Sequence, residues 1–333
     1  MLAVLSTVFL TACEARLDLT QTDAEKARTI TRSDSFHGAA QFGNAIVVVG
    51  ARGLVLSSAD RGATWQRQSL SYNNKARRPF LIDVTTCDDG TFLALDKTGS
   101  LWMATDPAAE WHARPISTEE DMLAVTCDPR QRLWVVGAYG SILSSGDAGE
   151  TWQDHSFNDD VIFNTVQFLD ADHGFVTGEY GTVLATTDGG ATWAERTPAP
   201  DEFYILTAHF EDASRGWLAG PKGLIYATSD GAGSWQLEST RSDATILKIT
   251  ASANGDLYAV GSGGVVARRD TDCCWSVWRV DPMIRSFLSA ALVMDDGTLL
   301  IAGGQGAFKI VSLAPGDQNA DISAQNSARG GRR

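Results

Sequence analysis

Short alternating runs of hydrophobic and polar residues recur along most of the chain, separated by turns rich in glycine. In one representative unit we expect strands at residues 205–210, 216–219, 224–227 and 235–238. The first strands of successive units share an apolar column formed by Val84, Val125, Val166, Ala208 and Ile249. An alternation of period two indicates a strand with one packed face and one wet face. The pattern therefore predicts an all-β fold of short antiparallel strands.

A glycine-centred segment of the form Val-Gly-x-x-Gly, first seen at residues 49–53, repeats along the chain. The second glycine of each copy is Gly53, Gly99, Gly140, Gly181, Gly223, Gly264 and Gly306. Consecutive glycines are 41 to 46 residues apart, which is the length of a four-stranded propeller blade. We therefore expect residues 28–313 to form a seven-bladed β-propeller of four-stranded antiparallel blades.

The expected ring has a water-filled centre, and its last blade must be joined to its first. Polar positions of the innermost strands would face the central channel, namely His37, Asp83, His209 and Lys248, and a water-filled channel accounts for them without a metal. The last unit supplies only three strands and ends near Leu313. We predict that residues 28–32 supply the missing outer strand, because an open ring would leave two unpaired strand edges.

Most copies continue into a turn with the pattern Ser/Thr-x-Asp-x-Gly-x-x-Trp, known as the Asp-box. It is complete at residues 58–65, 145–152 and 186–193 and degenerate elsewhere. The positions concerned are Asp60, Trp65, Asp106, Trp111, Asp147, Trp152, Asp188, Trp193, Asp230, Trp235 and Trp275. The aspartate can accept N–H groups of its own turn, and the tryptophan can pack between blades. One catalytic centre does not need copies spread round a ring, so we assign them a structural role and expect no catalytic, metal or cofactor site.

The charge balance limits the choice of partners. The chain of 333 residues has 41 acidic and 27 basic residues, and its formal charge is −14. Nucleic-acid binding depends on a basic excess that neutralises phosphates, so we expect no nucleic-acid partner. Residues 314–333 are polar, lack periodicity and are predicted to be a disordered tail.

The N-terminus has the features of an export signal. Residues 1–12 are uncharged and mostly apolar, but too short to span a bilayer. The sequence Leu-Thr-Ala-Cys that ends at Cys13 resembles the lipobox of bacterial lipoproteins, in which the cysteine is lipidated. Residues 1–13 are therefore interpreted as signal and lipobox, and residues 14–27 as a tether. A cleaved signal with an incidental cysteine is the alternative. With lipidation, Glu14 favours a periplasm-facing lipoprotein of the outer rather than the inner membrane.

Four further cysteines fall in the propeller region. Cys87 and Cys127 occupy matching points of successive repeats, so their spacing permits a disulfide. Cys273 and Cys274 are adjacent and could form a vicinal bridge or remain two thiols. Neither pair has the spacing of a metal site.

The Asp-boxes and their Val-Gly-x-x-Gly lead-in resemble the photosystem II stability/assembly factor family over about residues 36–313. Members form seven-bladed propellers, and the best-known ones are non-enzymatic and bind an early reaction-centre protein during membrane-protein assembly. The resemblance implies a monomeric, non-catalytic scaffold for a membrane-protein complex, here of the bacterial envelope. The family's arginine patch has no residue-by-residue match in this chain. Sialidases and some glucan hydrolases also carry Asp-boxes, so an exported glycoside hydrolase is the alternative.

Strand direction alternates within a blade, so the loops after the second and fourth strands share one face of the ring and the Asp-boxes share the other. Two groups stand out on the first face. A basic group consists of Lys75, Arg77 and Arg78. An acidic group with aromatic residues consists of Glu119, Glu120, Asp121, Phe157, Asp159, Asp160, Asp201, Glu202, Phe203 and Tyr204. Solvated loop charge accounts for both groups. A partner-docking face, with aromatic anchors inside a polar rim, is the functional alternative.

Overall fold

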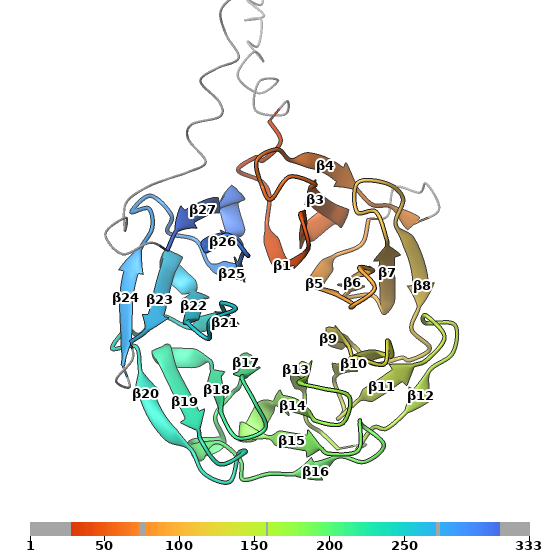
Figure 1. Cartoon of the computed structure of the whole chain (residues 1–333), viewed down its shortest axis with the longest axis vertical. Helices are drawn as coiled ribbons and strands as arrows, with labels where there is room; N and C mark the ends of the chain where they lie inside the picture. The colour runs from red at the N-terminus through yellow and green to blue at the C-terminus, as the bar shows by residue number, and fades with distance from the viewer. Residues whose placement is uncertain (1–27, 73–77, 158, 271–273, 314–333) are drawn as a thin grey trace, which may run out of the picture.

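Seven antiparallel sheets stand around a central channel in the computed structural model, which describes residues 28–72, 78–157, 159–270 and 274–313 (Figure 1). Six sheets have four strands each and the last has three. Each sheet is one blade, with its first strand at the channel and its last strand at the outer rim (Figure 1). The predicted seven-bladed propeller is confirmed.

The blades follow one another in chain order. Blade 1 contains β1 (Phe36–Phe42), β2 (Ala45–Gly50), β3 (Leu54–Ser58) and β4 (Gln66–Ser69). Blade 2 contains β5 (Leu81–Thr86), β6 (Phe92–Asp96), β7 (Ser100–Ala104) and β8 (His112–Pro115). Blade 3 contains β9 (Met122–Cys127), β10 (Leu133–Gly137), β11 (Ile142–Ser145) and β12 (Gln153–Asp154). Blade 4 contains β13 (Phe163–Phe168), β14 (Gly174–Gly178), β15 (Val183–Thr186) and β16 (Ala194–Glu195).

The remaining blades repeat this order. Blade 5 contains β17 (Thr207–Phe210), β18 (Gly216–Ala219), β19 (Leu224–Thr228) and β20 (Gln236–Ser239). Blade 6 contains β21 (Ile246–Ala251), β22 (Leu257–Gly261), β23 (Val265–Arg269) and β24 (Trp275–Arg279). Blade 7 contains β25 (Leu288–Val293), β26 (Thr298–Gly303) and β27 (Phe308–Ser312). Short 3-10 turns are η1 (Ala51–Gly53), η3 (Glu179–Gly181), η4 (Pro200–Glu202), η5 (Pro221–Gly223), η6 (Ser262–Gly264) and η7 (Gly304–Gly306).

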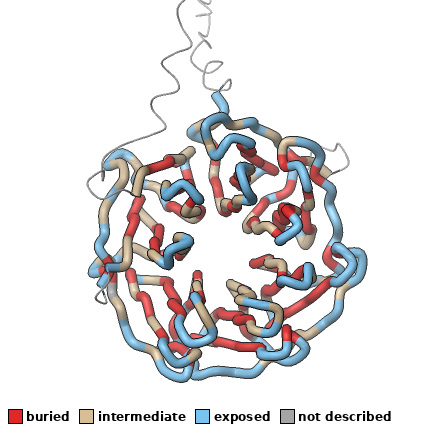
Figure 2. The backbone as a smooth tube through the Cα atoms, in the orientation of Figure 1, coloured by how far each residue is buried: buried red, intermediate tan, exposed pale blue. Residues whose placement is uncertain are grey.

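Burial across each blade explains the composition of its strands. The second strands, such as β10, are buried along their whole length. The innermost strands alternate, so that Val84 is buried between the half-buried Asp83 and Thr85. The outermost strands β4 and β8 are largely exposed, and Figure 2 shows the same change from a buried interior to an exposed rim. The apolar material of the chain therefore lies between blades.

Aromatic side chains fill the interfaces between neighbouring blades. Trp134 of blade 3 is fully buried, with its ring centre 5.1 Å from Phe168 and 5.9 Å from Trp193 of blade 4. Trp65 of blade 1 meets Phe308 of blade 7 edge-on at 5.0 Å. Burial of each large ring of this kind stabilises the fold by about 2–3 kcal/mol, so these contacts hold neighbouring blades together.

Ring closure differs from the prediction. Residues 28–32 form bends and the start of a turn rather than a strand, so blade 7 keeps three strands in the part of the chain that the structure describes. The residues that follow still take the place of a blade connection, because Gly306 N–H donates to Asp34 O at 2.8 Å. Arg67 of β4 fixes Asp34 with two hydrogen bonds of 2.7 and 2.9 Å. Together with the Trp65–Phe308 contact, one backbone hydrogen bond and the Arg67–Asp34 pair thus join blade 1 and the segment before it to blade 7 without a fourth strand.

A disulfide links Cys87 to Cys127, with a Cα–Cα distance of 5.2 Å and a sequence separation of 40. The bond joins the end of the first strand of blade 2 to that of blade 3, next to an apolar cluster shared by the two blades. Cys274 is exposed and Cys273 lies outside the described residues, so the vicinal pair stays a prediction.

The termini and tails add two facts. The expected signal, lipobox, tether and C-terminal tail all lie outside the described residues. Within the described ranges, no helix has the length and apolar character needed to cross a bilayer.

Candidate functional site

The carboxylates of the Asp-boxes are occupied by their own turns. Asp188 accepts hydrogen bonds from Thr186 Oγ1 at 2.8 Å, Thr192 N–H at 2.9 Å and Thr192 Oγ1 at 2.6 Å. Asp60, Asp147 and Asp230 accept the same set from their turns. Hydrogen bonds from Thr192 and Thr186 lower the pKa of Asp188 to about 2. These groups are bound, fully ionised and exposed, which suits a turn and not a proton donor.

The Asp-box tryptophans lie against their blades rather than around a cleft. Trp111 and Trp275 are buried, and the indole N–H of Trp275 donates to Glu238 of the preceding blade at 3.1 Å. Trp152 and Trp193 are half-buried. The degenerate Asp-box of blade 2 keeps one turn bond, from Ala108 N–H to Asp106 at 2.9 Å. The motif thus serves the fold on the face that carries the turns between third and fourth strands.

The opposite face, here called the loop face, carries the turns between second and third strands and the connections between blades. Hydrogen bonds tie each turn to the neighbouring connections. Gly140 N–H donates to Val161 O at 2.7 Å, and Glu179 N–H donates to Ile162 O at 2.9 Å. Gly181 N–H donates a third hydrogen bond of this kind, to Phe203 O at 2.8 Å. The loops of blades 3 to 5 therefore form one rigid rim.

Exposed aromatic side chains gather on this rim. Tyr139 and Tyr180 are 58% and 57% exposed, and Phe157 and Tyr204 are each 39% exposed. We call these four residues the aromatic rim. Burial and the neighbouring Glu179 carboxylate raise the pKa of Tyr204, which shows how closely acidic and aromatic groups are interleaved here. Clusters of exposed aromatics inside a polar surround are typical of interaction sites.

The two most exposed tyrosines sit in unfavourable backbone conformations. Tyr180 has φ 56° and ψ 25°, and Gly181 follows with φ 72°, which defines a type I′ turn. Tyr139 and Gly140 repeat the arrangement with φ 54° and 61°. The first central position of such a turn favours Gly, Asn or Asp, and a bulky residue there costs about 1 kcal/mol. The alternation of strand direction predicts that turns between second and third strands lie on this face, but it did not single out either tyrosine. Their position before the second repeat glycine is the signal that could have done so.

The predicted surface residues have mixed outcomes. Glu119, Glu120, Asp121, Phe157, Asp159, Asp160, Asp201, Glu202 and Tyr204 lie on the loop face and are exposed or half-buried. Phe203 differs, because it is only 7% exposed and packs edge-on against Tyr226 at 5.0 Å, so it belongs to the core. Arg78 is exposed, while Lys75 and Arg77 lie outside the described residues. The acidic group is thus brought together, and the basic group stays untested.

Charge is divided across the loop face. The loops of the aromatic rim contain one basic residue, Arg196, and eight acidic residues: Glu119, Glu120, Asp121, Asp159, Asp160, Glu179, Asp201 and Glu202. Among the described residues, none of these eight forms an ion pair within 4.0 Å. The other half of the face carries Arg32, Arg52, Arg78, Lys97, Lys222, Arg241 and Arg285. The face therefore presents an acidic half and a basic half.

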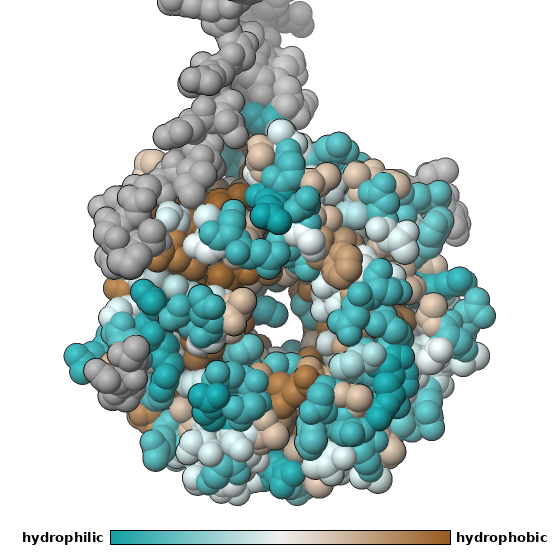
Figure 3. All heavy atoms as spheres, viewed as in Figure 1, coloured by the Kyte–Doolittle hydropathy of each residue, from teal (hydrophilic) through white to brown (hydrophobic). Residues whose placement is uncertain are grey.

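The central channel contains a cavity of about 710 Å³ lined by the innermost strands, and Figure 3 shows an opening at the centre of the ring. His37, Asp83, His209 and Lys248 line it, as the alternation predicts. Burial raises the pKa of Asp83, partly offset by the charge of Lys248. Burial and Lys248 lower the pKa of His209 to about 4, so His209 is neutral at pH 7. Among the described residues, no group of three His, Cys, Asp or Glu side chains could hold a metal ion.

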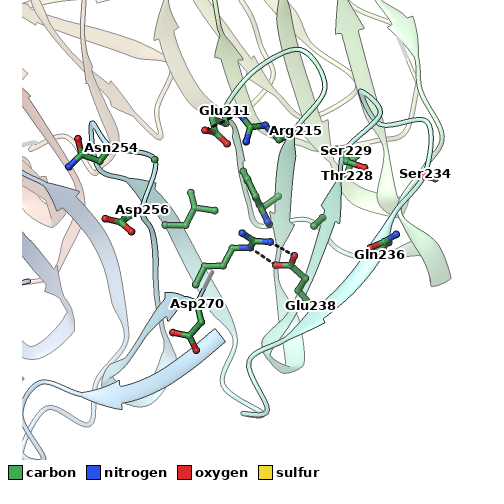
Figure 4. Close-up of a pocket in the computed structure, with 15 residues that line it drawn as sticks. Glu211, Arg215, Thr228, Ser229, Ser234, Gln236, Glu238, Asn254, Asp256 and Asp270 are labelled. Atoms are coloured by element: carbon green, nitrogen blue, oxygen red, sulfur yellow. Dashed lines mark hydrogen bonds and ion pairs between the residues drawn. The ribbon is translucent and has the colours of Figure 1, made fainter. Parts of the chain in front are cut away.

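A polar groove of about 420 Å³ lies between blades 5 and 6 on the Asp-box face (Figure 4). Arg269 spans it with hydrogen bonds of 2.9 and 2.7 Å to Glu238 and lies over Trp217 at 5.1 Å. Glu211 pairs with Arg215 at 3.2 Å within blade 5. Glu238 and Glu211 thus serve as links between and within blades.

Fold and surface together define a class: a seven-bladed Asp-box propeller with one structural face and one aromatic, charged loop face. The family model described as "Photosynthesis system II assembly factor YCF48" matches residues 156–239. The chain is 32% identical over 156 residues to the "Photosystem II assembly lipoprotein Ycf48" of Synechocystis sp.. That match covers 45% of this chain and 42% of the relative, so it spans less than half of either. The resemblance to the photosystem II assembly factor family is confirmed.

Solved structures share the fold at low sequence identity. A structure described as "YCF48 bound to D1 peptide" is 14% identical with a TM-score of 0.69, covering 85% of this chain and 93% of the other. YCF48 from Cyanidioschyzon merolae is 17% identical with a TM-score of 0.64, covering 83% and 94%. A streptogramin B lyase is 11% identical with a TM-score of 0.71, covering 83% and 93%. Assembly factors and lyases thus share this ring, and the ring alone does not decide between them.

Proposed function

We propose that this chain is a non-catalytic scaffold or assembly factor that binds a membrane-protein complex of the bacterial envelope. Its relative from Synechocystis sp. is called an assembly lipoprotein, and one YCF48 structure holds a D1 peptide. A propeller that holds a peptide, as in that structure, is the kind of binding that the proposal extends to this chain.

The observation that carries the proposal is the division of labour between the two faces. On the Asp-box face, carboxylates such as Asp60 and Asp188 are saturated by their own turns. On the loop face, Tyr139 and Tyr180 are held out into solvent at an energetic cost. Rigid, exposed aromatics with unpaired charges around them suit capture of a polypeptide, because interface energy concentrates in such anchors. The glycoside hydrolase alternative has no comparable support.

We further propose that the protein faces the periplasm as a lipoprotein attached through Cys13, at the outer rather than the inner membrane. The lipobox-like sequence supports attachment, and the disulfide between Cys87 and Cys127 suits an oxidising compartment. A Cys13→Ser variant should move from the membrane fraction to the soluble fraction. Cys274→Ser is the matched control and should stay with the membrane.

Purification of the tagged chain from solubilised membranes tests the function. The expected result is a defined membrane-protein complex recovered with the chain, and no turnover of a panel of glycans. Glycan cleavage that disappears when one loop carboxylate is changed would favour the hydrolase. Recovery of the chain alone, from membranes of its native cell that contain all of their membrane-protein complexes, would count against the proposed scaffold function.

A further inference from the structure

The acidic half of the loop face combines three features in one place. The aromatic rim supplies four exposed rings from blades 3 to 5. The same loops contain eight acidic residues and one basic residue, Arg196. Hydrogen bonds from Gly140 to Val161 and from Gly181 to Phe203 keep the loops together, so little order has to be gained on binding.

Four non-glycine residues of this half have left-handed backbone conformations, as do Arg52, Lys222, Arg241 and Gln305 elsewhere on the loop face. Besides Tyr139 and Tyr180, two consecutive acidic residues, Asp201 and Glu202, have φ of 58° and 51°. They form the centre of a turn that Phe203 N–H closes on Pro200 O at 3.2 Å. Glycine would adopt every one of these conformations without a steric penalty. Their replacement by glycine therefore tests what the side chains contribute without straining the turns.

We propose that the acidic half of the loop face docks a positively charged segment of the partner polypeptide, with the aromatic rim as its anchor. Charge complementarity selects this occupant, since lysine and arginine pair with carboxylates and also bind over aromatic rings. Anionic lipid surfaces and nucleic acids carry the same sign as this half and are repelled. The inference rests on the proposed function and assigns it a surface and a partner chemistry.

Glycine variants separate binding from folding. Tyr139→Gly/Tyr180→Gly removes two rings of the aromatic rim, and Asp201→Gly/Glu202→Gly removes two of the neighbouring carboxylates. We call these two the rim variants. In both of them glycine relieves the backbone strain of the left-handed conformation. Thermal stability should stay equal or rise, whereas affinity should fall by roughly tenfold to a hundredfold. The matched control is Gln305→Gly/Ala148→Gly, which relieves φ of 57° at both positions outside the acidic half and should keep full affinity.

Two kinds of binding measurement complete the test. The first titrates the full chain with a labelled, unstructured lysine-rich peptide and with the same peptide carrying glutamate at each lysine. The lysine peptide should bind, weaken with added salt, and lose affinity only in the rim variants. The second compares recovery of the membrane complex by the wild type and by each variant.

The outcomes are distinct. Equal binding of both peptides, or equal weakening in the control variant, would overturn the docking surface. Recovery of the complex by wild type and rim variants alike would do the same while leaving the scaffold function intact. If the wild type recovers no complex, that result would instead contradict the proposed function. Concentration-dependent dimers that disappear in the rim variants would replace the partner by a second copy of this chain.

Discussion

Removal of the disulfide between blades 2 and 3 should lower stability by an amount that follows from its loop. Cys87 and Cys127 are 40 residues apart in sequence, so the bond restricts a loop of that length in the unfolded chain. The chain-entropy model gives about 4 kcal/mol for such a loop. An unfolding entropy of about 2 cal/mol/K per residue over a ring of this size converts that into a fall in Tm of about 7 °C.

Calorimetry of the Cys87→Ser/Cys127→Ser variant measures the effect. The oxidised wild type, the reduced wild type and the variant should be compared at one pH and concentration. Because serine keeps nearly the volume of cysteine, the apolar cluster at this interface should persist, and reduced wild type and variant should melt together. Reductant should leave the variant unchanged. A fall of less than about 2 °C, or a variant that responds to reductant as the wild type does, would refute the assignment of the stability to this bond.

Three further predictions concern the fold. Asp188 has its pKa lowered to about 2, against about 3.9 when unfolded, so its stabilisation is complete above pH 4 and lost as pH falls through 2; Asp188→Asn should flatten this part of the denaturation-midpoint profile. Gly181→Ala drives a Cβ into the Ala199 carbonyl oxygen at φ 72°, and urea denaturation should show a loss of more than about 2 kcal/mol. Arg67→Ala leaves the buried Asp34 carboxylate without its guanidinium and should cost about 2 kcal/mol by thermal denaturation, with Arg67→Lys in between.

Periodic features of the chain could be predicted because they recur. The glycine spacing indicated seven blades, and the strand expected at residues 216–219 is β18 with the same bounds. The first strand of that blade begins later than expected, at Thr207, because Ile205 is buried between blades and bonds to Gly178 O at 3.4 Å. Contacts between blades have no counterpart in a local pattern, so strand ends of this kind escape it.

Features that occur once were harder to predict. Residues 28–32 were expected to close the ring as a strand. Instead, an ion pair between Asp34 and Arg67 holds the N-terminal segment, and this pair has no counterpart in the other repeats that would have predicted it. Phe203 looked like a surface anchor beside Tyr204, although their alternation allows only one of the two to be exposed. A single sequence gives the spacing of such neighbours, and the packing of the adjacent blade decides which of them is buried.

The type I′ turns explain how one ring can serve different partners. Their first central position holds Arg52, Tyr139, Tyr180, Lys222, Gly263 and Gln305, all with φ between 54° and 68°. The backbone is the same in each case, because the following glycine and the inter-loop hydrogen bonds set it. The side chain at this position points out of the fold, so its identity can change without disturbing the blades. An acidic, aromatic surface can therefore stand here on the same propeller that carries an arginine patch in the family it resembles. Replacing Tyr139 and Tyr180 by glycine should accordingly abolish binding at this surface and leave the propeller folded.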